Sequence, residues 1–483
     1  MNEIYDDIDE KIRLDVQNRL LKDFEISVLN SVSDDLSGFN VLDIGCNRGN
    51  RFCSLFEGYP IRKGIGIDIN PELVKEANAN HGSDVFGFYC LDAESPDFVR
   101  NMVPVLKENS ILHFDIICIS YVLLHLKDPQ KLLKKIRGFL ADNGTIIITE
   151  PDDKASFMTA DNEDNFSHML KILDEDPFSG NRDFAYTLDR VAEESGYEIA
   201  ETFPVLLRGS GKAAEQKRDV YNVFFSFLSA DMKLLCESTE DNAVFSDHGR
   251  WIENHEEYFE DKLRSEECEI AAGVMIKTIK KAFFEKQTVP FKETEGFRLE
   301  LLGFEEAGEA KKLTDFCVGT NLYSVEDFET VYYDCDSWFY FLKTESGENA
   351  GYIYFILSDM KYIENYTGIP EKYYTDIFGM DDPVVGDLKS GGVLPAFRKK
   401  KLSLHMYRFA VGELEEKGAE VLTGICWEYD GKIPIAPTLE HLGFKYLTTA
   451  FRPWYNHLKL ICPVCKGRCV CDAAVYFKII NQK

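Results

Sequence analysis

The chain has 483 residues, of which 45% are hydrophobic and 28% charged, an ordinary globular composition with room for more than one domain. Its formal net charge of −29 disfavours a broad nucleic-acid interface, because an acidic surface repels phosphates. No apolar run reaches the roughly 18 residues of a membrane helix, and the acidic N-terminus is unlike a secretory signal. Thirteen cysteines without such a signal indicate the reducing cytoplasm.

The first elements expected along the chain are a helical segment at 1–36 and then alternating strands and helices. Residues 188–196 and 197–206 continue this alternation with one more helix and one more strand. The pattern predicts a parallel sheet covered by helices on both faces. The earlier strands are expected at 41–45, 64–68, 86–91, 114–120 and 145–150, and the clearest helices between them at 71–80 and 129–140.

The pattern changes at residue 208. Residues 208–268 are polar, helical and rich in aromatics, and a strand is expected after them at 272–279. We interpret 208–268 as an insertion into a domain spanning 37–282; its aromatics either form a substrate lid or pack only a small core of their own. A linker at 283–296 then leads to a second strand-and-helix domain, 297–483.

A glycine-rich turn follows the first expected strand. Gly45 and Gly49 tolerate positive φ and let a ligand approach the backbone, and Asn47 between them is a residue that also visits the left-handed region. The helix after the turn offers free amides. Asp68 ends the next strand about 20 residues on, where a carboxylate meets ribose hydroxyls. Together they predict a nucleoside cofactor site.

These motifs resemble the class I S-adenosylmethionine (SAM)-dependent methyltransferases over residues 35–205, with 206–282 less clearly covered. The resemblance implies SAM as cofactor and an acidic residue two before the first glycine, which Asp43 matches. It departs from the family at Asn47, where many members have glycine. A dinucleotide dehydrogenase is the rival, but it prefers G-x-G-x-x-G, whereas this turn is G-x-N-x-G. The SAM-binding residues that the resemblance implies are Asp43, Gly45, Asn47, Gly49, Asp68, Ile69, Asp92, Ala93 and Ser120.

Methyl transfer requires a positioned acceptor, and a base where the acceptor carries a proton. The candidates near the expected strand ends are Tyr121, His125 and Glu150. His125 could equally be a structural or cofactor-side residue.

A second anion site is indicated between an expected strand at 384–393 and a helix at 404–417. A strand, a basic loop and a helix N-terminus form a cradle for a pyrophosphate, although a solvated basic turn would look similar. The arrangement resembles the GCN5-related N-acetyltransferase (GNAT) superfamily over 297–458, an α+β fold that binds acetyl-CoA. Lys401 and Ser403 replace the family's usual small residues, and Leu439 stands where many members have a tyrosine acid. The acid–base candidates of this half are Glu428, Tyr429 and His441. The implied acetyl-CoA residues are Val393, Arg398, Lys399, Lys400, Lys401 and Ser403.

Four thiols lie within residues 462–471: Cys462, Cys465, Cys469 and Cys471. The C-P-x-C-x-G turn resembles a zinc knuckle, and four thiolates would complete a tetrahedral structural Zn²⁺ site. A redox-active dithiol is the alternative.

The sequence therefore predicts a bifunctional transferase: a SAM-dependent methyltransferase acting on a small molecule of the amine type, fused to a GNAT-like acyltransferase. One alternative is a methyltransferase for tRNA or protein whose C-terminal half is a noncatalytic recognition module. Another is a SAM-responsive binding protein without turnover. The sequence does not indicate the oligomeric state.

Overall fold

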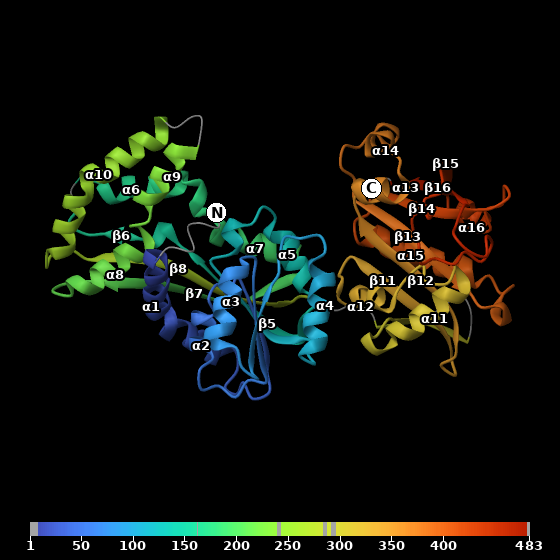
Figure 1. Ribbon diagram of the computed structural model, residues 1–483, viewed down its shortest axis with the longest axis horizontal. Coiled ribbons are helices and arrows are strands. Elements are labelled where there is room, and N and C mark those ends of the chain that lie inside the picture. Colours follow the sequence, from blue (N-terminus) through green and yellow to red (C-terminus); the bar gives the residue numbers. More distant parts are fainter. Residues whose placement is uncertain (1–7, 162, 239–242, 284–286, 291–295, 481–483) are drawn as a thin grey trace. The chain divides into compact units, whose positions relative to one another are not determined.

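The computed structural model describes residues 8–161, 163–238, 243–283, 287–290 and 296–480. The chain divides into two compact units, Met1–Phe284 and Glu285–Lys483, each built around its own sheet (Figure 1). The expected linker lies partly outside the described residues, as do residues 1–7 of the expected N-terminal helical segment. Among the helices in the described ranges, none combines the length and apolar character needed to cross a bilayer.

The first unit contains a sheet with the strands β1 (Asn40–Ile44), β2 (Lys63–Asp68), β3 (Phe86–Cys90), β4 (Phe114–Ser120), β5 (Leu140–Pro151), β6 (Phe157–Met158), β7 (Tyr197–Gly209) and β8 (Ile270–Lys281). Their order is β3-β2-β1-β4-β5-β8-β6, and β7 also pairs with β8. Strands β1 to β5 are parallel, which confirms the expected Rossmann-like α/β sheet. β8 runs antiparallel to β5 and β7, in contrast to the parallel pairing of β1 to β5. The physical reason is that the helical insertion leaves the end of β7 and re-enters at the start of β8, where Gly209 and Ile270 are paired. The chain therefore returns along β7 without crossing over the sheet.

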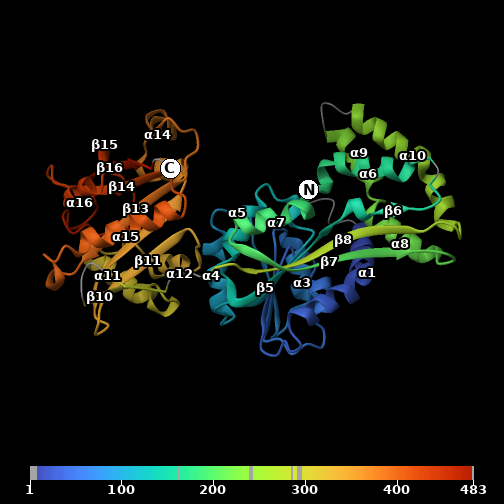
Figure 2. The same ribbon diagram turned by 180° about the vertical axis from the view of Figure 1, so that it is seen from behind.

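The helices of the first unit are α1 (Ile8–Val32), α2 (Asn50–Leu55), α3 (Pro71–His81), α4 (Phe98–Glu108), α5 (Pro129–Ile136), α6 (Asn165–Glu175), α7 (Phe184–Glu194), α8 (Ala214–Phe224), α9 (Leu228–Ser238) and α10 (Ala243–Arg264). Helices α1 to α3 cover one face of the sheet and α4, α5 and α7 the other (Figures 1 and 2). Caps fix where helices begin: Asn70 accepts hydrogen bonds from two amides at the start of α3, and Asp128 accepts one from Lys131 in α5. The aromatics of α8 and α10 join α1 and α6 in one apolar core, so this insertion is not packed only on itself.

The second unit contains a mainly antiparallel sheet with the strands β9 (Thr288–Pro290), β10 (Phe297–Leu301), β11 (Ser337–Thr344), β12 (Asn349–Ser358), β13 (Val385–Val393), β14 (Val421–Glu428), β15 (Lys445–Ala450) and β16 (Asp472–Ile479). Their order is β15-β16-β14-β13-β12-β11-β10-β9. Among the strands that the structure describes in this unit, only β13 and β14 are parallel neighbours, and they pair over three positions, Val385–Asp387 with 421–423. Beyond these residues β13 stays with β12 and β14 with β16, so a gap opens in the sheet.

The helices of the second unit are α11 (Ala307–Cys317), α12 (Val325–Tyr333), α13 (Met360–Thr367), α14 (Glu371–Phe378), α15 (Leu402–Glu416) and α16 (Ala436–His441). Side chains alternate across β11 and β12, so each face of the sheet has its own core. Trp338 and Tyr340 pack with α15 on one face, whereas Phe339 and Phe341 pack with α11 and α12 on the other. The segment between β13 and α15 starts from the end of β13 that is no longer paired with β14.

Candidate functional site

The turn between β1 and α2 has the conformation that the glycine-rich motif predicts. Gly45, Asn47 and Gly49 all have positive φ, at 75°, 49° and 76°. A Cβ on Gly49 would lie 2.7 Å from the ring of Phe88, and one on Gly45 would lie 2.4 Å from Val122. Glycine is thus required at both ends of the turn by conformation and by space. Asn47 fits the middle because asparagine adopts the left-handed conformation more readily than most residues.

Asp68 lies at the end of β2, beside this turn. Its Oδ2 accepts a hydrogen bond of 2.8 Å from the Asn47 amide, and its Oδ1 accepts one of 2.9 Å from the Asn70 amide. The structure thus joins two residues that the sequence analysis proposed for SAM binding. The next residue, Ile69, is 62% exposed, an unusual place for a large aliphatic side chain and a suitable surface for a flat ring.

The remaining residues of the predicted SAM set occupy the same edge of the sheet. Asp92 and Ala93 follow β3, and the exposed Asp92 accepts a hydrogen bond of 2.9 Å from the Glu94 amide. Ser120 ends β4, and within the described residues its buried Oγ has no hydrogen-bond partner. Carboxyl ends of parallel strands meet at one edge, where sheets of this kind bind ligands.

Asp43 lies deeper, in a buried charge cluster. Its Oδ1 is 3.2 Å from Arg51 Nη1, and the same guanidinium pairs with Glu25 of α1 at 2.7 Å. Burial raises the pKa of Asp43 to about 7, against the opposing effect of Arg51. Asp43 therefore ties the cofactor strand to α1 and α2.

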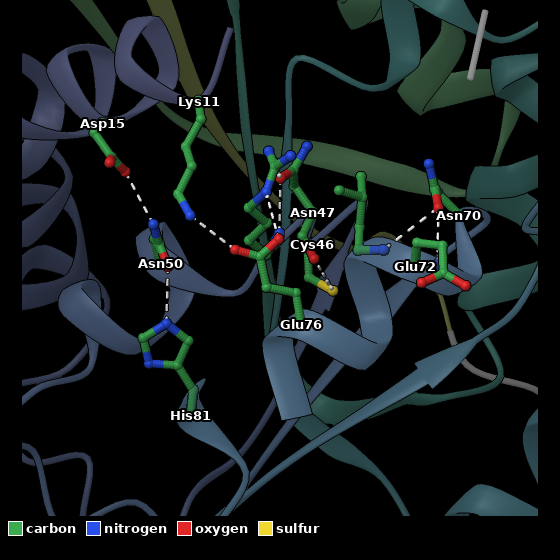
Figure 3. A network of polar contacts seen from close by, with 11 residues as sticks. Lys11, Asp15, Cys46, Asn47, Asn50, Asn70, Glu72, Glu76 and His81 are labelled. Carbon is green, nitrogen blue, oxygen red and sulfur yellow. Dashed lines mark hydrogen bonds and ion pairs between the residues drawn. The ribbon is translucent and has the colours of Figure 1, made fainter. Parts of the chain in front are cut away.

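Helix α1 is joined to the turn by a polar network (Figure 3). Glu76 of α3 accepts from Lys11 at 2.8 Å and from Arg48 at 2.9 Å. Asn50 donates to Asp15 at 2.9 Å, so α1 is anchored at two points along the turn and α2. The sequence analysis missed these residues because the contacts join positions up to 65 residues apart.

The three acid–base candidates of the first unit lie around the segment after β4. Tyr121 has a positive φ of 55°, and burial raises the pKa of its phenol well above the usual range. Glu150 is fully buried, and its Oε1 accepts a hydrogen bond of 3.0 Å from the Leu123 amide. Burial raises the pKa of Glu150 to about 8. The Glu150 carboxyl group thus fixes the start of the single helical turn Leu123–His125 by this hydrogen bond.

His125 is exposed at the end of that turn, beside two arginines. Desolvation by the surrounding protein, together with the charges of Arg182 and Arg13, lowers the pKa of His125 to about 4. Both arginines are held in place: Arg182 donates twice to Asp153 at 2.7 Å, and Arg13 donates to the Val223 carbonyl at 2.7 Å. At neutral pH the side chain is therefore a neutral imidazole, and each of the two arginines is paired with a carboxylate, Arg13 with Glu10 and Arg182 with Asp153.

Comparisons with known proteins cover the same part of the chain. Residues 15–202 match a family described as a methyltransferase domain. The chain is 26% identical over 171 residues to juvenile hormone acid O-methyltransferase of Bombyx mori, covering 34% of this chain and 58% of that protein. It is 29% identical over 124 residues to aklanonic acid methyltransferase of Streptomyces sp. (strain C5), covering 25% and 51%.

Solved structures include a SAM-dependent methyltransferase from Geobacter sulfurreducens in complex with S-adenosyl-L-homocysteine, with 15% identity and a TM-score of 0.29 over 53% of this chain and 90% of that one. The matched segment spans between half and three fifths of the two curated relatives. Residues 15–202 form a class I SAM-dependent methyltransferase domain.

The second unit has a cavity of about 350 Å³ next to the gap between β13 and β14. Of the residues that the sequence analysis assigned to acetyl-CoA, all but Lys400 line it; the Lys400 ammonium lies 5.4 Å from the ring centroid of Phe297 instead. Lys401 caps α15 with a φ of 58°, and Lys399 has a φ of 70°. The lining that the sequence analysis missed is Cys317, Gly391, Gly392, Phe397, Leu402, Tyr407 and Ile435.

Glu428, one of the acid–base candidates of the second unit, is not among the residues that line this cavity. It lies at the far end of β14, where its Oε2 accepts a hydrogen bond of 3.3 Å from Thr449 of β15. A different polar cluster is buried on β13. Thr423 donates to Asp387 at 2.9 Å, and Lys389 donates to Tyr362, with its ammonium 4.6 Å from the ring centroid of Tyr366. A register shift places these residues where β13 bulges from β12.

The four clustered cysteines come together in the loop between β15 and β16. The Sγ atoms of Cys462, Cys465, Cys469 and Cys471 all lie within 4.8 Å of one another, and all four are free thiols.

Proposed function

We propose that the first unit transfers the methyl group of SAM to a small-molecule acceptor. The observation that carries the proposal is the pairing of Asp68 with the turn 45–49 at the edge of a class I methyltransferase sheet. The Asp68 carboxylate would accept hydrogen bonds from the ribose hydroxyls of SAM. Ile69 and Asp92 would contact the adenine, and the turn 45–49 would let the methionine part of SAM approach the backbone closely. SAM supplies the methyl group when bound.

The charges beside His125 favour an acidic acceptor over an amine. Arg13 and Arg182 both act on His125 as positive charges, and this effect favours a carboxylate over an ammonium group even though Glu10 and Asp153 pair with the two arginines. A carboxylate oxygen also needs no base, because it has no proton to lose before it attacks the methyl group. The two curated relatives are named for acids, which supports the same acceptor class.

The direct test measures S-adenosylhomocysteine formed by the full chain with SAM and two panels of small molecules, carboxylic acids and primary amines. We expect turnover with members of the acid panel, abolished by Asp68→Ala and retained by Asp84→Ala, which removes an exposed carboxylate in the bend before β3. Turnover with amines alone would overturn the acidic acceptor but leave methyl transfer standing. Absence of SAM binding would overturn both.

For the second unit, we propose binding of acetyl-CoA in the cavity beside β13. Support comes from the gap between two parallel strands, which gives an extended ligand a place between them, and from the cations at the start of α15. The pyrophosphate would lie against Lys399, Lys401 and the α15 amides. SAM and acetyl-CoA, as donors of a methyl and an acetyl group, would then serve one pathway in which the two units modify the same or related metabolites.

Calorimetric titration with acetyl-CoA tests this proposal. The Lys399→Ala/Lys401→Ala double variant is expected to bind at least tenfold more weakly, since each charge-assisted contact contributes about 1.5–3 kcal/mol before solvent screening. Lys445→Ala removes an exposed cation on β15 and serves as the matched control. If wild-type protein does not bind acetyl-CoA, the proposal is wrong, and copurifying RNA or protein would favour a recognition module instead.

A further inference from the structure

The loop between β15 and β16, residues 451–471, is the longest connection in the second unit. It contains neither a helix nor a strand over 21 positions, apart from a single bridge between Ile461 and Thr320. Loops of this length without secondary structure are uncommon in compact domains and need some other source of order. The four thiols lie at its C-terminal end.

The loop nevertheless has a small core of its own. Cys462, Cys469 and Cys471 are each at most 5% exposed, and they pack with Leu460. Around them lie Leu322, Trp427, Trp454 and Val464. Burying thiols in this way gives little stability by itself, because one leucine and a few partly buried neighbours are a small apolar core.

The geometry points to a tetrathiolate zinc site formed by Cys462, Cys465, Cys469 and Cys471. Zinc–sulfur bonds of about 2.3 Å in a tetrahedron place the sulfurs about 3.8 Å apart. The Cys462 and Cys471 Sγ atoms are 4.0 Å apart and those of Cys465 and Cys471 3.5 Å. A disulfide requires about 2.05 Å, so the thiols are spaced for one shared ion rather than for a bond between two of them.

The backbone around the first two thiols is arranged as a metal-binding turn. The Cys465 amide donates to Cys462 Sγ at 3.3 Å, and the Cys462 amide donates to the Gly467 carbonyl at 3.0 Å. Lys466 closes the turn with a left-handed φ of 56°. Amide hydrogen bonds to sulfur stabilise the thiolate form, and zinc binding requires that form. The basic Lys466 and Arg468 also suit an ion whose four thiolates exceed its own positive charge.

The zinc site would be structural, since all four coordination positions are taken by protein. Its effect on the unit runs through Trp454, which packs on the thiol cluster. Trp454 donates from its indole to Tyr366 at 2.7 Å, and Tyr366 stacks on Tyr362, the partner of Lys389. A metal bound to the four thiols would thereby fix the position of Trp454, and through Trp454 that of Tyr366 beside the buried polar cluster on β13.

The test measures the zinc content of the full chain by mass spectrometry after purification without added metal. We expect about one equivalent in the wild type and in Cys335→Ser, which replaces a cysteine of the same unit outside the cluster, and less than a fifth of an equivalent in Cys465→Ser. Cys465 is chosen because it is the least buried of the four. Zinc content of Cys465→Ser equal to that of the wild type would overturn the site.

Metal replacement keeps the test decisive if the variant fails to fold. Wild-type protein depleted of zinc and given Co²⁺ should show thiolate-to-cobalt charge-transfer bands together with the visible bands of tetrahedral cobalt, and added Zn²⁺ should abolish both. Wild-type protein that holds no zinc and gives no such spectrum would refute the inference. If the mass of the intact chain is lower by two hydrogen atoms and a reductant restores the full mass, the cysteines instead form a redox-active dithiol.

Discussion

Asparagine in place of Asp68 is the sharpest perturbation of the proposed SAM site. The carboxylate accepts from two backbone amides, Asn47 at 2.8 Å and Asn70 at 2.9 Å, and is proposed to accept from the ribose as well. The asparagine amide has one acceptor oxygen, so at least one of these donors loses its partner. Hydrogen bonds to a charged group contribute about 1.5–3 kcal/mol, which corresponds to roughly a 10- to 100-fold loss of SAM affinity. Because Asp68 is partly exposed, we expect the lower half of this range.

Calorimetric titration of Asp68→Asn with SAM and with S-adenosylhomocysteine measures the loss. Chemical denaturation measured in parallel should show that the free energy of unfolding falls by about 1–2 kcal/mol, because one backbone donor is left without an acceptor. Asp84→Asn makes the same change at an exposed position and should leave both quantities unchanged. A SAM dissociation constant within twofold of the wild type in folded Asp68→Asn would refute the assignment of this carboxylate to the ribose.

Three further predictions concern the same unit. Gly49→Ala should destabilise the fold more than Gly58→Ala: both glycines have positive φ, which costs an alanine about 1–2 kcal/mol, but only at Gly49 does the new Cβ meet Phe88. Equal denaturation midpoints for the two variants would contradict the steric argument. Burial raises the pKa of Glu150 to about 8 from an ordinary value of 4.5, so its contribution to stability is complete below pH 4.5 and is lost as the pH rises towards 8; wild-type stability relative to Glu150→Gln should fall over this range in pH-dependent denaturation. His125, with a pKa lowered to about 4, stays neutral from pH 6 to 8, so kcat/KM for an acidic acceptor should show no step near 6.5. A step there that disappears in His125→Asn would show that the imidazole titrates during the reaction.

Much of the first unit could be read from the chain because its determinants are local. The turn 45–49, the acid at Asp68 and the cap at Asn70 each act within a few residues of one strand end. Short, nearly continuous apolar runs located the parallel strands, because a strand that is buried on both faces of the sheet has apolar residues at successive positions. The reversal of β8 could not be read in this way, because strand direction depends on where an insertion leaves and re-enters the sheet.

Residues acting over long sequence separations were missed for the same reason. Arg182 and Arg13 reach His125 from different elements, and their influence on its pKa exists only in the folded chain. Glu150 is the last residue of the expected strand 145–150, which suggested a catalytic carboxylate at a strand end, but the hydrogen bond that it accepts from the Leu123 amide favours a positioning role. In the second unit, the polar cluster around Lys389 depends on a bulge in β13 that no residue pattern indicated.

The sequence by itself determined the cofactor turn, the positions of the early strands along the chain and the four-thiol motif, because each rests on conformational or chemical needs of residues close together in the chain. Tertiary structure alone decided how α1 is joined to the turn, which charges surround His125 and how the sulfurs are spaced. Electrostatic and packing energies depend on distances in space, and only folding brings together side chains that the sequence holds far apart.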